Sequence, residues 1–295
     1  MKILVTGANG QVGWELTRLG RVSDHEIVAC ARDRLDITQK EAVEALIEKE
    51  QPQLVINAAA YTAVDRAEEE REIAWAINCN GPQFLAAACQ QFALPLFHIS
   101  TDYVFDGTGD APYSERDPVA PLGVYGESKW AGEEVVRSEA DRHLILRTSW
   151  VFGSHGHNFV KTILRVAAER SELRVVADQL GSPTSARGIA RTLLALAERY
   201  REQGDLAWGT YHFTGAPFTS WHGFATEIVE RAIATGLLAQ PVTVTPITTA
   251  EYPTPAERPA NSRLSSARLQ QQFGLDADDW QQELDLVLST LLSPQ

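Results

Sequence analysis

The chain has 295 residues, of which 22% are charged and 44% hydrophobic, and its formal net charge is −13. This length and balance are typical of a globular protein with a sizeable core, arranged as one large domain or two smaller ones. The strong acidity argues against nucleic acid or an anionic membrane surface as a partner, because such binding depends on Lys and Arg neutralising phosphates.

The cysteine content points to a reducing compartment. Cys30, Cys79 and Cys89 are an odd number, form no C-x-x-C pair and give no disulfide framework. No stretch approaches the roughly twenty apolar residues of a membrane span, and the N-terminus lacks the features of a secretory signal. We therefore expect a cytoplasmic protein.

The first thirteen residues predict a buried strand, a glycine turn and the start of a helix. Residues 2–6 are apolar and β-branched, and the turn that follows is Gly7-Ala-Asn-Gly10-Gln11-Val12-Gly13. Free amides at such a helix start face an anion, helped by the helix dipole. A glycine turn alone is a weak signal, but strand-like runs at 26–29 and 54–57 follow. We expect a dinucleotide bound by Gly7, Gly10, Gln11, Val12 and Gly13.

Strand-like and helix-like segments alternate through the first half, with further strands at 95–100 and 144–147. The pattern predicts an α/β fold, a Rossmann-type doubly wound parallel sheet with ligands beyond the carboxyl ends of its strands. We expect residues 1–150 to form the dinucleotide-binding domain, with about 171–200 returning to it. The remainder of 151–295 is expected to form a smaller, discontinuous α/β domain that binds the substrate.

A helix is predicted over 38–50 by apolar residues at helical spacing. Thr38 precedes it and Glu41 lies three residues further on, which is the sequence signature of a capping box. We therefore expect Thr38 to be the N-cap of this helix.

Tyr125 and Lys129 are the residues best suited to proton transfer. They are four apart in a helical segment, so both can face one cleft. A nearby ammonium favours phenolate, and bringing a tyrosine pKa from about 10 toward 7 takes roughly 4 kcal/mol. Tyr125 could then exchange a proton with a substrate oxygen. The same spacing also occurs by chance on solvated helix faces, and the preceding glycine turn is what favours the catalytic interpretation.

Several motifs together carry a family resemblance. They are the glycine turn at 7–13, Asn57-Ala-Ala-Ala60, Ser100-Thr-Asp-Tyr-Val-Phe105 and Tyr125-x-x-x-Lys129, followed by Arg147-Thr-Ser-Trp-Val151, Asp178-Gln-Leu-Gly-Ser-Pro-Thr184 and Arg258-Pro-Ala-Asn-Ser-Arg-Leu264. The first four resemble the extended short-chain dehydrogenase/reductase superfamily. With the last three, which are more specific, the chain resembles the dTDP-4-dehydrorhamnose reductase family over essentially its full length.

The resemblance implies reduction of the C4 ketone of dTDP-4-dehydro-L-rhamnose to dTDP-L-rhamnose with NAD(P)H. It implies that Tyr125 protonates the developing alkoxide, that Lys129 holds the nicotinamide ribose and tunes Tyr125, and that Thr101 hydrogen-bonds the same oxygen. The substrate-binding residues implied are Thr101, Asp102, Tyr103, Trp150, Asn261 and Arg263, the last two at the nucleotide diphosphate. Solvated-loop or core roles remain open for Trp150, Asn261 and Arg263.

The cofactor expected is NADPH, with NADH also possible. Cys30 stands where many relatives end the second strand with an acidic residue, and Arg32 lies close by, which suits a 2′-phosphate. By resemblance, Asp36 and Ile37 contact the adenine side, and Ala60, Tyr61 and Thr62 form the wall of the pyrophosphate and ribose.

Two other functions share part of this set of motifs. A nucleotide-sugar dehydratase or epimerase shares the turn, the tyrosine and the lysine, but dehydratases place a glutamate where this chain has Tyr103. A non-catalytic NADP-binding regulatory subunit resembling the β-subunit of methionine adenosyltransferase is the other alternative, and an intact set of Thr101, Tyr125 and Lys129 argues against it.

No metal site is expected from the sequence. His155-Gly-His157 has no third ligand nearby. Some members of the resembled family form a metal-linked dimer through acidic residues, and Glu15 could be one of these, but Arg187 falls where an acid would stand. A homodimer therefore remains open.

Overall fold

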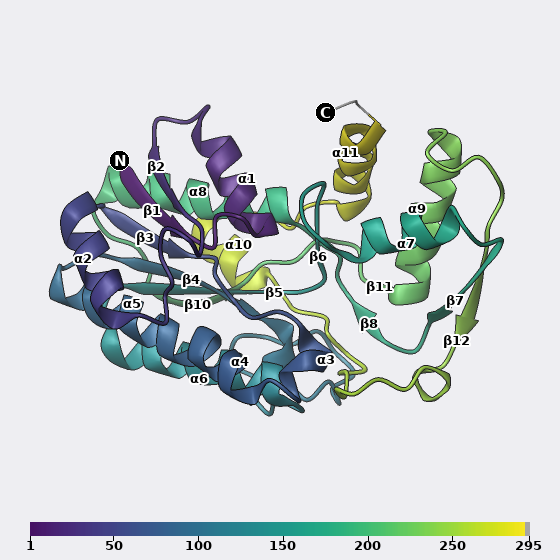
Figure 1. The fold of residues 1–295 in the computed structure, drawn as a ribbon, viewed down its shortest axis with the longest axis horizontal. Coiled ribbons are helices and arrows are strands. Elements are labelled where there is room, and N and C mark those ends of the chain that lie inside the picture. The colour runs from purple at the N-terminus through teal and green to yellow at the C-terminus, as the bar shows by residue number, and fades with distance from the viewer. Residues whose placement is uncertain (293–295) are drawn as a thin grey trace.

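The computed structural model describes residues 1–292, which form a large lobe and a small lobe side by side (Figure 1). The large lobe is built on a six-stranded, wholly parallel sheet in the order β10-β5-β4-β3-β1-β2. The strands are β1 (Lys2–Thr6), β2 (Glu26–Cys30), β3 (Leu54–Asn57), β4 (Leu96–Thr101), β5 (His143–Thr148) and β10 (Gly209–His212). The predicted doubly wound α/β fold is confirmed.

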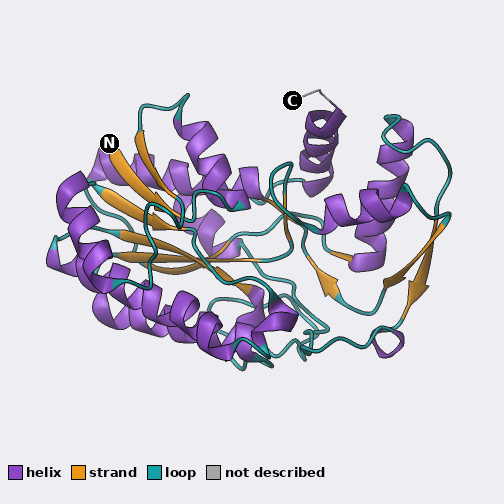
Figure 2. Ribbon diagram, in the orientation of Figure 1, coloured by secondary structure: helices purple, strands orange, loops and turns teal. Residues whose placement is uncertain are grey.

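Helices cover both faces of this sheet (Figure 2). One face packs against α1 (Gln11–Gly20), α8 (Ala186–Gln203) and α10 (Ala267–Phe273), and the other against α2 (Lys40–Glu50), α5 (Gly81–Gln91) and α6 (Val124–Glu139). Alternate strand residues enter the two cores, so Leu4 lies in one and Val5 in the other. Burial on both faces explains why the strands read as continuous apolar runs.

The strand order reverses beside β1, which pairs with β2 on one side and β3 on the other. Crossovers on opposite faces leave a crevice at such a switch point, beyond the carboxyl ends of the strands. Between β3 and β4 the chain forms α3 (Val64–Ala67), α4 (Arg71–Trp75) and a π-helical turn (Ala76–Asn80) that runs directly into α5. A 3₁₀ turn (Asp102–Val104) follows β4.

The small lobe has its own hydrophobic core, which includes Phe152, Phe224 and Trp280. Its helices are α7 (Phe159–Ala167), α9 (Trp221–Ala234) and α11 (Trp280–Leu292), and a 3₁₀ turn spans Thr249–Glu251. Its strands form three pairs: β6 (Val151–Phe152) with β9 (Thr184–Ser185), β7 (Glu172–Val176) with β12 (Thr243–Ile247), and β8 (Leu180–Gly181) with β11 (Thr219–Ser220).

The segment expected to return to the large lobe begins later than predicted. Strand β7 pairs with β12 in the small lobe, while α8 and β10 pack into the large lobe. The apolar stripe of α8, which includes Ile189, Leu193 and Leu196, is what covers the sheet. Residues 186–212 and 267–273, instead of about 171–200, therefore complete the large lobe from the second half of the chain.

The predicted cap of α2 is wrong. The helix begins at Lys40, and Gln39 precedes it without a side-chain cap. The Thr38 hydroxyl and amide both donate to Asp36 Oδ1, at 2.7 and 3.0 Å. Since α2 begins at Lys40, Thr38 lies before the N-cap position, and its hydroxyl closes a local turn with Asp36 instead. Within residues 1–292, no helix is long and apolar enough to cross a membrane.

Candidate active site

The glycine turn between β1 and α1 is tightly closed. Gly7 has a φ of +67°, and its carbonyl accepts from the Gly10 amide at 2.9 Å. A Cβ on Gly13 would lie 2.2 Å from the Gly7 oxygen, and one on Gly7 would lie 2.6 Å from the Ala58 backbone at the end of β3. Gly10 caps α1 with no side chain, so the first-turn amides are left for an anion. This cradle fits a dinucleotide pyrophosphate.

Gln11 and Val12 occupy this turn but direct their side chains elsewhere. The Gln11 amide donates to the Val151 carbonyl at 3.4 Å and accepts from Asn158 Nδ2 at 2.9 Å, which ties α1 to the small lobe. Val12 packs into the core beneath α1. Both residues therefore offer a phosphate their backbone amides, not their side chains.

The end of β2 has the features expected beside an adenosine ribose. Cys30 is fully buried there, whereas the Arg32 side chain is 79% exposed. Arg32 Nε lies 3.5 Å from Asp36 Oδ2, and the Thr38 hydroxyl bond is the main cause that holds the pKa of Asp36 below its usual range. Ile37 is buried against Gly81. Arg32 is thus an exposed cation beside the end of β2, held within residues 1–292 only by its ion pair with Asp36.

Ala60, Tyr61 and Thr62 continue from β3 and are held by the helix that follows. The Tyr61 amide donates to Asn78 Oδ1 at 2.8 Å, and its hydroxyl donates to Glu70 Oε2 at 2.5 Å. Its ring joins a small apolar cluster that Tyr125 also touches. The segment predicted as the cofactor wall therefore lies next to Tyr125 on α6.

Thr101 and Tyr125 come together where β4 ends and α6 begins. Thr101 Oγ1 donates to Asp102 Oδ1 at 2.9 Å and accepts from the Tyr103 amide at 3.2 Å. The Tyr125 ring packs edge-on against Tyr103, with centroids 5.3 Å apart. Burial raises the pKa of Tyr125 to about 12, and the neighbouring Thr101 hydroxyl acts in the opposite direction.

The prediction that Lys129 lowers the pKa of Tyr125 is wrong for this structure. Lys129 lies one turn along α6, but its Nζ donates to the Ile99 carbonyl at 2.7 Å. Burial lowers the pKa of Lys129 to about 8, and Lys129 is not among the causes acting on Tyr125. Burial is the largest cause acting on the Tyr125 pKa, and the expected charge effect of Lys129 is absent. The Tyr125 phenol is therefore fully protonated at neutral pH.

A series of buried polar side chains lies beneath this site. Of these, only Asn57 was singled out from the sequence. The Thr6 hydroxyl donates to Asn57 Oδ1 at 2.6 Å, and Asn57 Nδ2 lies 3.0 Å from His98 Nδ1. Burial, together with Lys129 and Arg137, lowers the pKa of His98 well below its usual value, so the ring is neutral. The signal for His98 was a lone polar ring inside the apolar run of β4.

Two of the predicted substrate residues follow Thr101 directly. Asp102 is buried, its Oδ2 has no hydrogen-bond partner within residues 1–292, and burial raises its pKa to about 6. Burial likewise raises the pKa of Tyr103 above its usual value. An unpaired buried carboxylate oxygen beside Thr101 is suited to accept a bond from a ligand hydroxyl.

Trp150 stands at the start of the small lobe with a φ of +47°. Its indole stacks on that of Trp221, with centroids 3.6 Å apart and planes 12° apart. A Cβ on Gly181 would lie 2.4 Å from the same indole. Trp150 is therefore packed on one face by Trp221 and closely approached by the β8 backbone.

The side chains of Asn261 and Arg263 are hydrogen-bonded to other protein groups. Asn261 Nδ2 donates to the Gly109 and Ala111 carbonyls at 2.7 and 2.8 Å, and its Oδ1 accepts from Arg263 Nε at 2.8 Å. Arg263 Nη2 donates to the Asp110 carbonyl at 2.7 Å. The expectation that Asn261 contacts the diphosphate directly does not fit these bonds, because its amide is fully used in holding the loop at 109–111.

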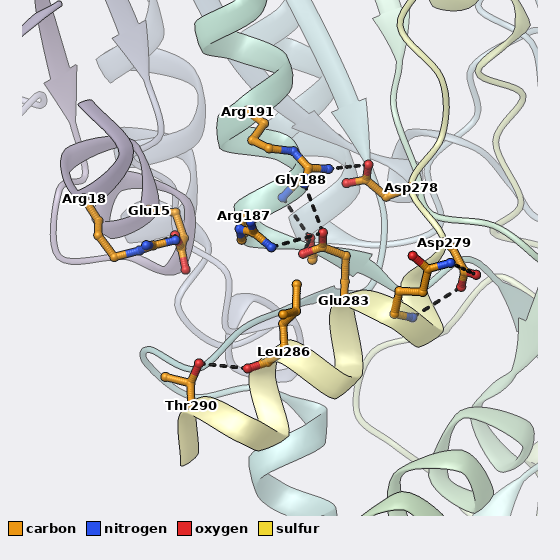
Figure 3. A network of polar contacts seen from close by, with 12 residues as sticks. Glu15, Arg18, Arg187, Gly188, Arg191, Asp278, Asp279, Glu283, Leu286 and Thr290 are labelled. Carbon is orange, nitrogen blue, oxygen red and sulfur yellow. Dashed lines mark hydrogen bonds and ion pairs between the residues drawn. The ribbon is translucent and has the colours of Figure 1, made fainter. Parts of the chain in front are cut away.

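Glu15, the acidic residue considered for a metal, is paired with an arginine, and so is the buried Glu283 beside Arg187 (Figure 3). Glu15 accepts two bonds from Arg18, at 2.9 and 2.7 Å. Glu283 on α11 accepts from Ser185 and Arg191 at 2.9 and 3.2 Å, and Arg187 Nη1 lies 3.5 Å away. Residues 1–292 contain no group of three or more His, Cys, Asp or Glu placed to hold a metal ion.

Comparison with known proteins identifies the family. Residues 1–293 match the family described as the RmlD substrate binding domain. The dTDP-4-dehydrorhamnose reductase of Burkholderia thailandensis is 47% identical over 99% of this chain and 100% of that protein. The enzyme of the same name from Escherichia coli K12 is 40% identical, with 99% of each chain covered.

Solved structures agree with this assignment. A dTDP-4-dehydrorhamnose reductase from Clostridium acetobutylicum superposes with a TM-score of 0.92 at 39% identity, covering 99% of this chain and 100% of that one. The enzyme of the same name from Bacillus anthracis, solved in complex with NADP, gives a TM-score of 0.90 at 35% identity, covering 98% and 99%. With its glycine cradle and its Thr101, Tyr125 and Lys129 in place, the chain belongs to the dTDP-4-dehydrorhamnose reductase family.

Proposed function

We propose that this protein reduces the C4 ketone of dTDP-4-dehydro-L-rhamnose to give dTDP-L-rhamnose, with NADPH as reductant. The observation that supports it best is the position of Thr101 beside Tyr125 at the carboxyl end of β4, near the glycine cradle at the switch point. Membership of the family points to the same reaction.

Bound NADPH supplies the hydride that adds to the C4 carbon of the ketone. Tyr125 then gives its proton to the developing alkoxide, a role for which a phenol that is fully protonated at neutral pH is well suited. Thr101 stands beside Tyr125, and its hydroxyl is proposed to turn from Asp102 Oδ1 and donate to the same oxygen, which fixes the angle of that oxygen and stabilises its charge. Lys129 is proposed to stabilise the tyrosinate left behind, once its ammonium turns from the Ile99 carbonyl toward Tyr125.

Asp102 and Trp150 are proposed to contact the sugar. The unpartnered Asp102 Oδ2 supports an acceptor role toward a sugar hydroxyl. The remaining open part of the Trp150 indole suits an apolar sugar face, because Trp221 covers only one side of it. Asn261 is proposed to act indirectly, by positioning Arg263 for the nucleotide diphosphate through its bond to Arg263 Nε.

The function is tested by mixing the protein with NADPH and dTDP-4-dehydro-L-rhamnose and following the absorbance of the reduced nicotinamide. We expect one NADPH to be consumed per sugar reduced. An epimerase or dehydratase would return its cofactor unchanged, and a regulatory subunit would bind NADPH without oxidising it, so either result would contradict the proposal.

The cofactor preference rests on Arg32 and Cys30. Because Arg32 is exposed and β2 ends in a buried thiol instead of a carboxylate, a 2′-phosphate meets a cation and no repulsion. We expect NADPH to be used at least as well as NADH. In Arg32→Ala the Michaelis constant for NADPH should rise toward that for NADH, while the NADH value stays the same. A wild-type preference for NADH would contradict this assignment.

A homodimer is proposed through the cleft between α1, α8 and α11. This cleft has a volume of about 300 Å³ and includes Trp14, Arg187 and the exposed Leu286 in its lining. Since Glu15 and Glu283 already pair with arginines, we propose association without a bridging metal. Size-exclusion chromatography with light scattering should give a dimer that EDTA leaves intact. A monomer, or dissociation by EDTA, would contradict it.

A cytoplasmic location is also proposed. Cys30, Cys79 and Cys89 are buried free thiols, which suit a reducing compartment. Fractionation of the source cells, with detection of the protein by antibody, tests the location directly.

A further inference from the structure

A buried carboxylate lies one helical turn beyond Lys129 and has no part in the mechanism above. Glu133 and Lys129 are both on α6, and their exposed fractions are 0% and 2%. Residues four apart on a helix lie one above the other. Glu133 accepts from Arg147 Nε and Nη2 at 2.8 and 2.7 Å, and from Arg137 Nη2 at 2.5 Å. The catalytic lysine and this carboxylate therefore share one dry compartment between β4, β5 and α6.

We propose that Glu133 is a positioning residue that keeps the Lys129 ammonium charged in this compartment and thereby sets the upper pH limit of the reduction. The proposal rests on the proposed function and assigns a new role within it. It follows from the position of the buried Glu133 carboxylate one helical turn from Lys129. Among the described residues, Lys129 has no ion-pair partner within 4 Å.

The other ionisable groups around Lys129 offer no alternative counter-charge. They come from β4, β5, the turn after β4, and α6 itself: His98, Arg147, Asp102, Tyr103, Tyr125 and Arg137. His98 and the two tyrosines are neutral at pH 7, and the two arginines are cations. Arg71, from α4, pairs with Glu127 on the exposed side of α6. Asp102 interacts with Thr101 and is not among the causes that act on the Lys129 pKa.

Glu133 is held in its charged form by its partners. Burial would raise its pKa, but the hydrogen bond and charge of Arg147, with the charge of Arg137, hold the pKa of Glu133 below its usual range. Burial lowers the pKa of Lys129 to about 8, and Glu133 acts in the opposite direction. Without this carboxylate, Lys129 would lose its proton at a lower pH.

The expected consequence is a change in the pH profile. Above the pKa of Lys129, the tyrosinate formed during reduction has no cation to stabilise it, so kcat/KM falls on the alkaline side. In Glu133→Gln we expect the midpoint of this alkaline limb to move down by about one pH unit, the size of shift that a close opposite charge produces.

The experiment compares four variants of the full-length protein. Glu133→Gln keeps the hydrogen-bond shape but not the charge, and Glu133→Asp keeps the charge. Because Glu133→Gln leaves Arg147 buried without its counter-ion, the double variant Glu133→Gln/Arg147→Gln provides a neutral pair that keeps the packing. Glu134→Gln is the matched control, since Glu134 is the next residue on α6, also pairs with Arg137 at 2.5 Å, and is 55% exposed.

The pH profile of kcat/KM is measured for each, together with its thermal midpoint and the pH dependence of NADPH binding without sugar. The proposal predicts that the midpoint of the alkaline limb moves to lower pH in the single and double Gln variants. It predicts the wild-type midpoint in Glu133→Asp and in Glu134→Gln. It is overturned if the folded Gln variants lose stability but keep the wild-type midpoint of the alkaline limb. Glu133 would then have only a structural role, linking α6 to β5. Should Glu133→Gln not fold, the double variant decides. A wild-type protein that oxidises no NADPH would instead refute the proposed function, and the binding profile would still test Glu133.

Discussion

The two lobes differ in how they treat their polar side chains. In the large lobe, groups at the carboxyl ends of β3 and β4 are buried in fixed positions, and some atoms, such as Asp102 Oδ2 and His98 Nε2, have no partner within residues 1–292. In the small lobe and the loop at 259–265, the residues expected to bind substrate are already bonded to protein carbonyls or stacked on aromatics, as Asn261 and Trp150 show.

This difference suggests that the large lobe holds the reacting groups, whereas the small lobe serves to recognise the substrate. A rigid parallel sheet can hold reacting groups in place before any ligand arrives, which lowers the cost of reaching the transition state. Loops that satisfy their own polar groups act instead by shape and by positioning a few side chains. Changes in the large lobe should therefore reduce turnover or cofactor binding, and changes in the small lobe should weaken substrate binding.

The largest expected effect tests the catalytic pair. Tyr125→Phe removes the proton donor while its ring continues to pack against Tyr103. We expect kcat to fall by at least about a hundredfold, in line with the usual contribution of acid–base groups. Fluorescence titration should show unchanged NADPH binding. Turnover close to that of the unaltered protein would remove Tyr125 from the mechanism.

The glycine cradle should be nearly as sensitive. A Cβ in Gly13→Ala would collide with the Gly7 backbone at 2.2 Å. Such overpacking typically costs about 1–3 kcal/mol, so the Kd for NADPH should rise by about ten- to a hundredfold. Gly204→Ala is the control for a loss of stability alone, because Gly204 has a φ of +75°, at which alanine is strained, but has nothing within 4 Å of its Cβ position. Equal loss of NADPH affinity in both variants would mean a general loss of folding.

Asp102 should show the cost of keeping an ionisable group buried. Its pKa rises from 3.8 to about 6 in the folded protein, so the folded state binds the proton more tightly and stability falls as pH rises through this range. Asp102→Asn removes that loss and still accepts from Thr101. Its free energy of unfolding should exceed that of wild type by about 1–3 kcal/mol at pH 7.5, with no gain at pH 3.5. Urea melts at the two pH values measure this, and a variant less stable at pH 7.5 would contradict it.

The smallest effect is expected in the small-lobe contacts. Asn261→Ala leaves the Gly109 and Ala111 carbonyls without their donor and frees the Arg263 guanidinium. Unpaired groups of this kind cost about 1–3 kcal/mol, which should appear as lost stability and a several-fold higher KM for the sugar, with kcat nearly unchanged. A drop in kcat comparable to that of Tyr125→Phe would break the separation between the lobes.

Much of the fold could be predicted from the residues. The apolar run at 54–57 and the apolar stripe on α8 predict a strand and a helix by their periodicity and length, which are local properties of the chain. The errors came where a neighbour competed for the same group, as when Asp36 captured the Thr38 hydroxyl, or where a strand found a distant partner, as β7 did with β12.

The sequence by itself determined the sheet, the glycine turn and the spacing of Tyr125 and Lys129, because each depends on residues close together in the chain. Only the tertiary structure decided the pKa values of those two groups. Burial, which no local pattern reports, raised the pKa of one and lowered that of the other. The Lys129 ammonium reached the Ile99 carbonyl, and Glu133 became its buried neighbour, because β4, β5 and α6 pack together across more than forty residues of chain.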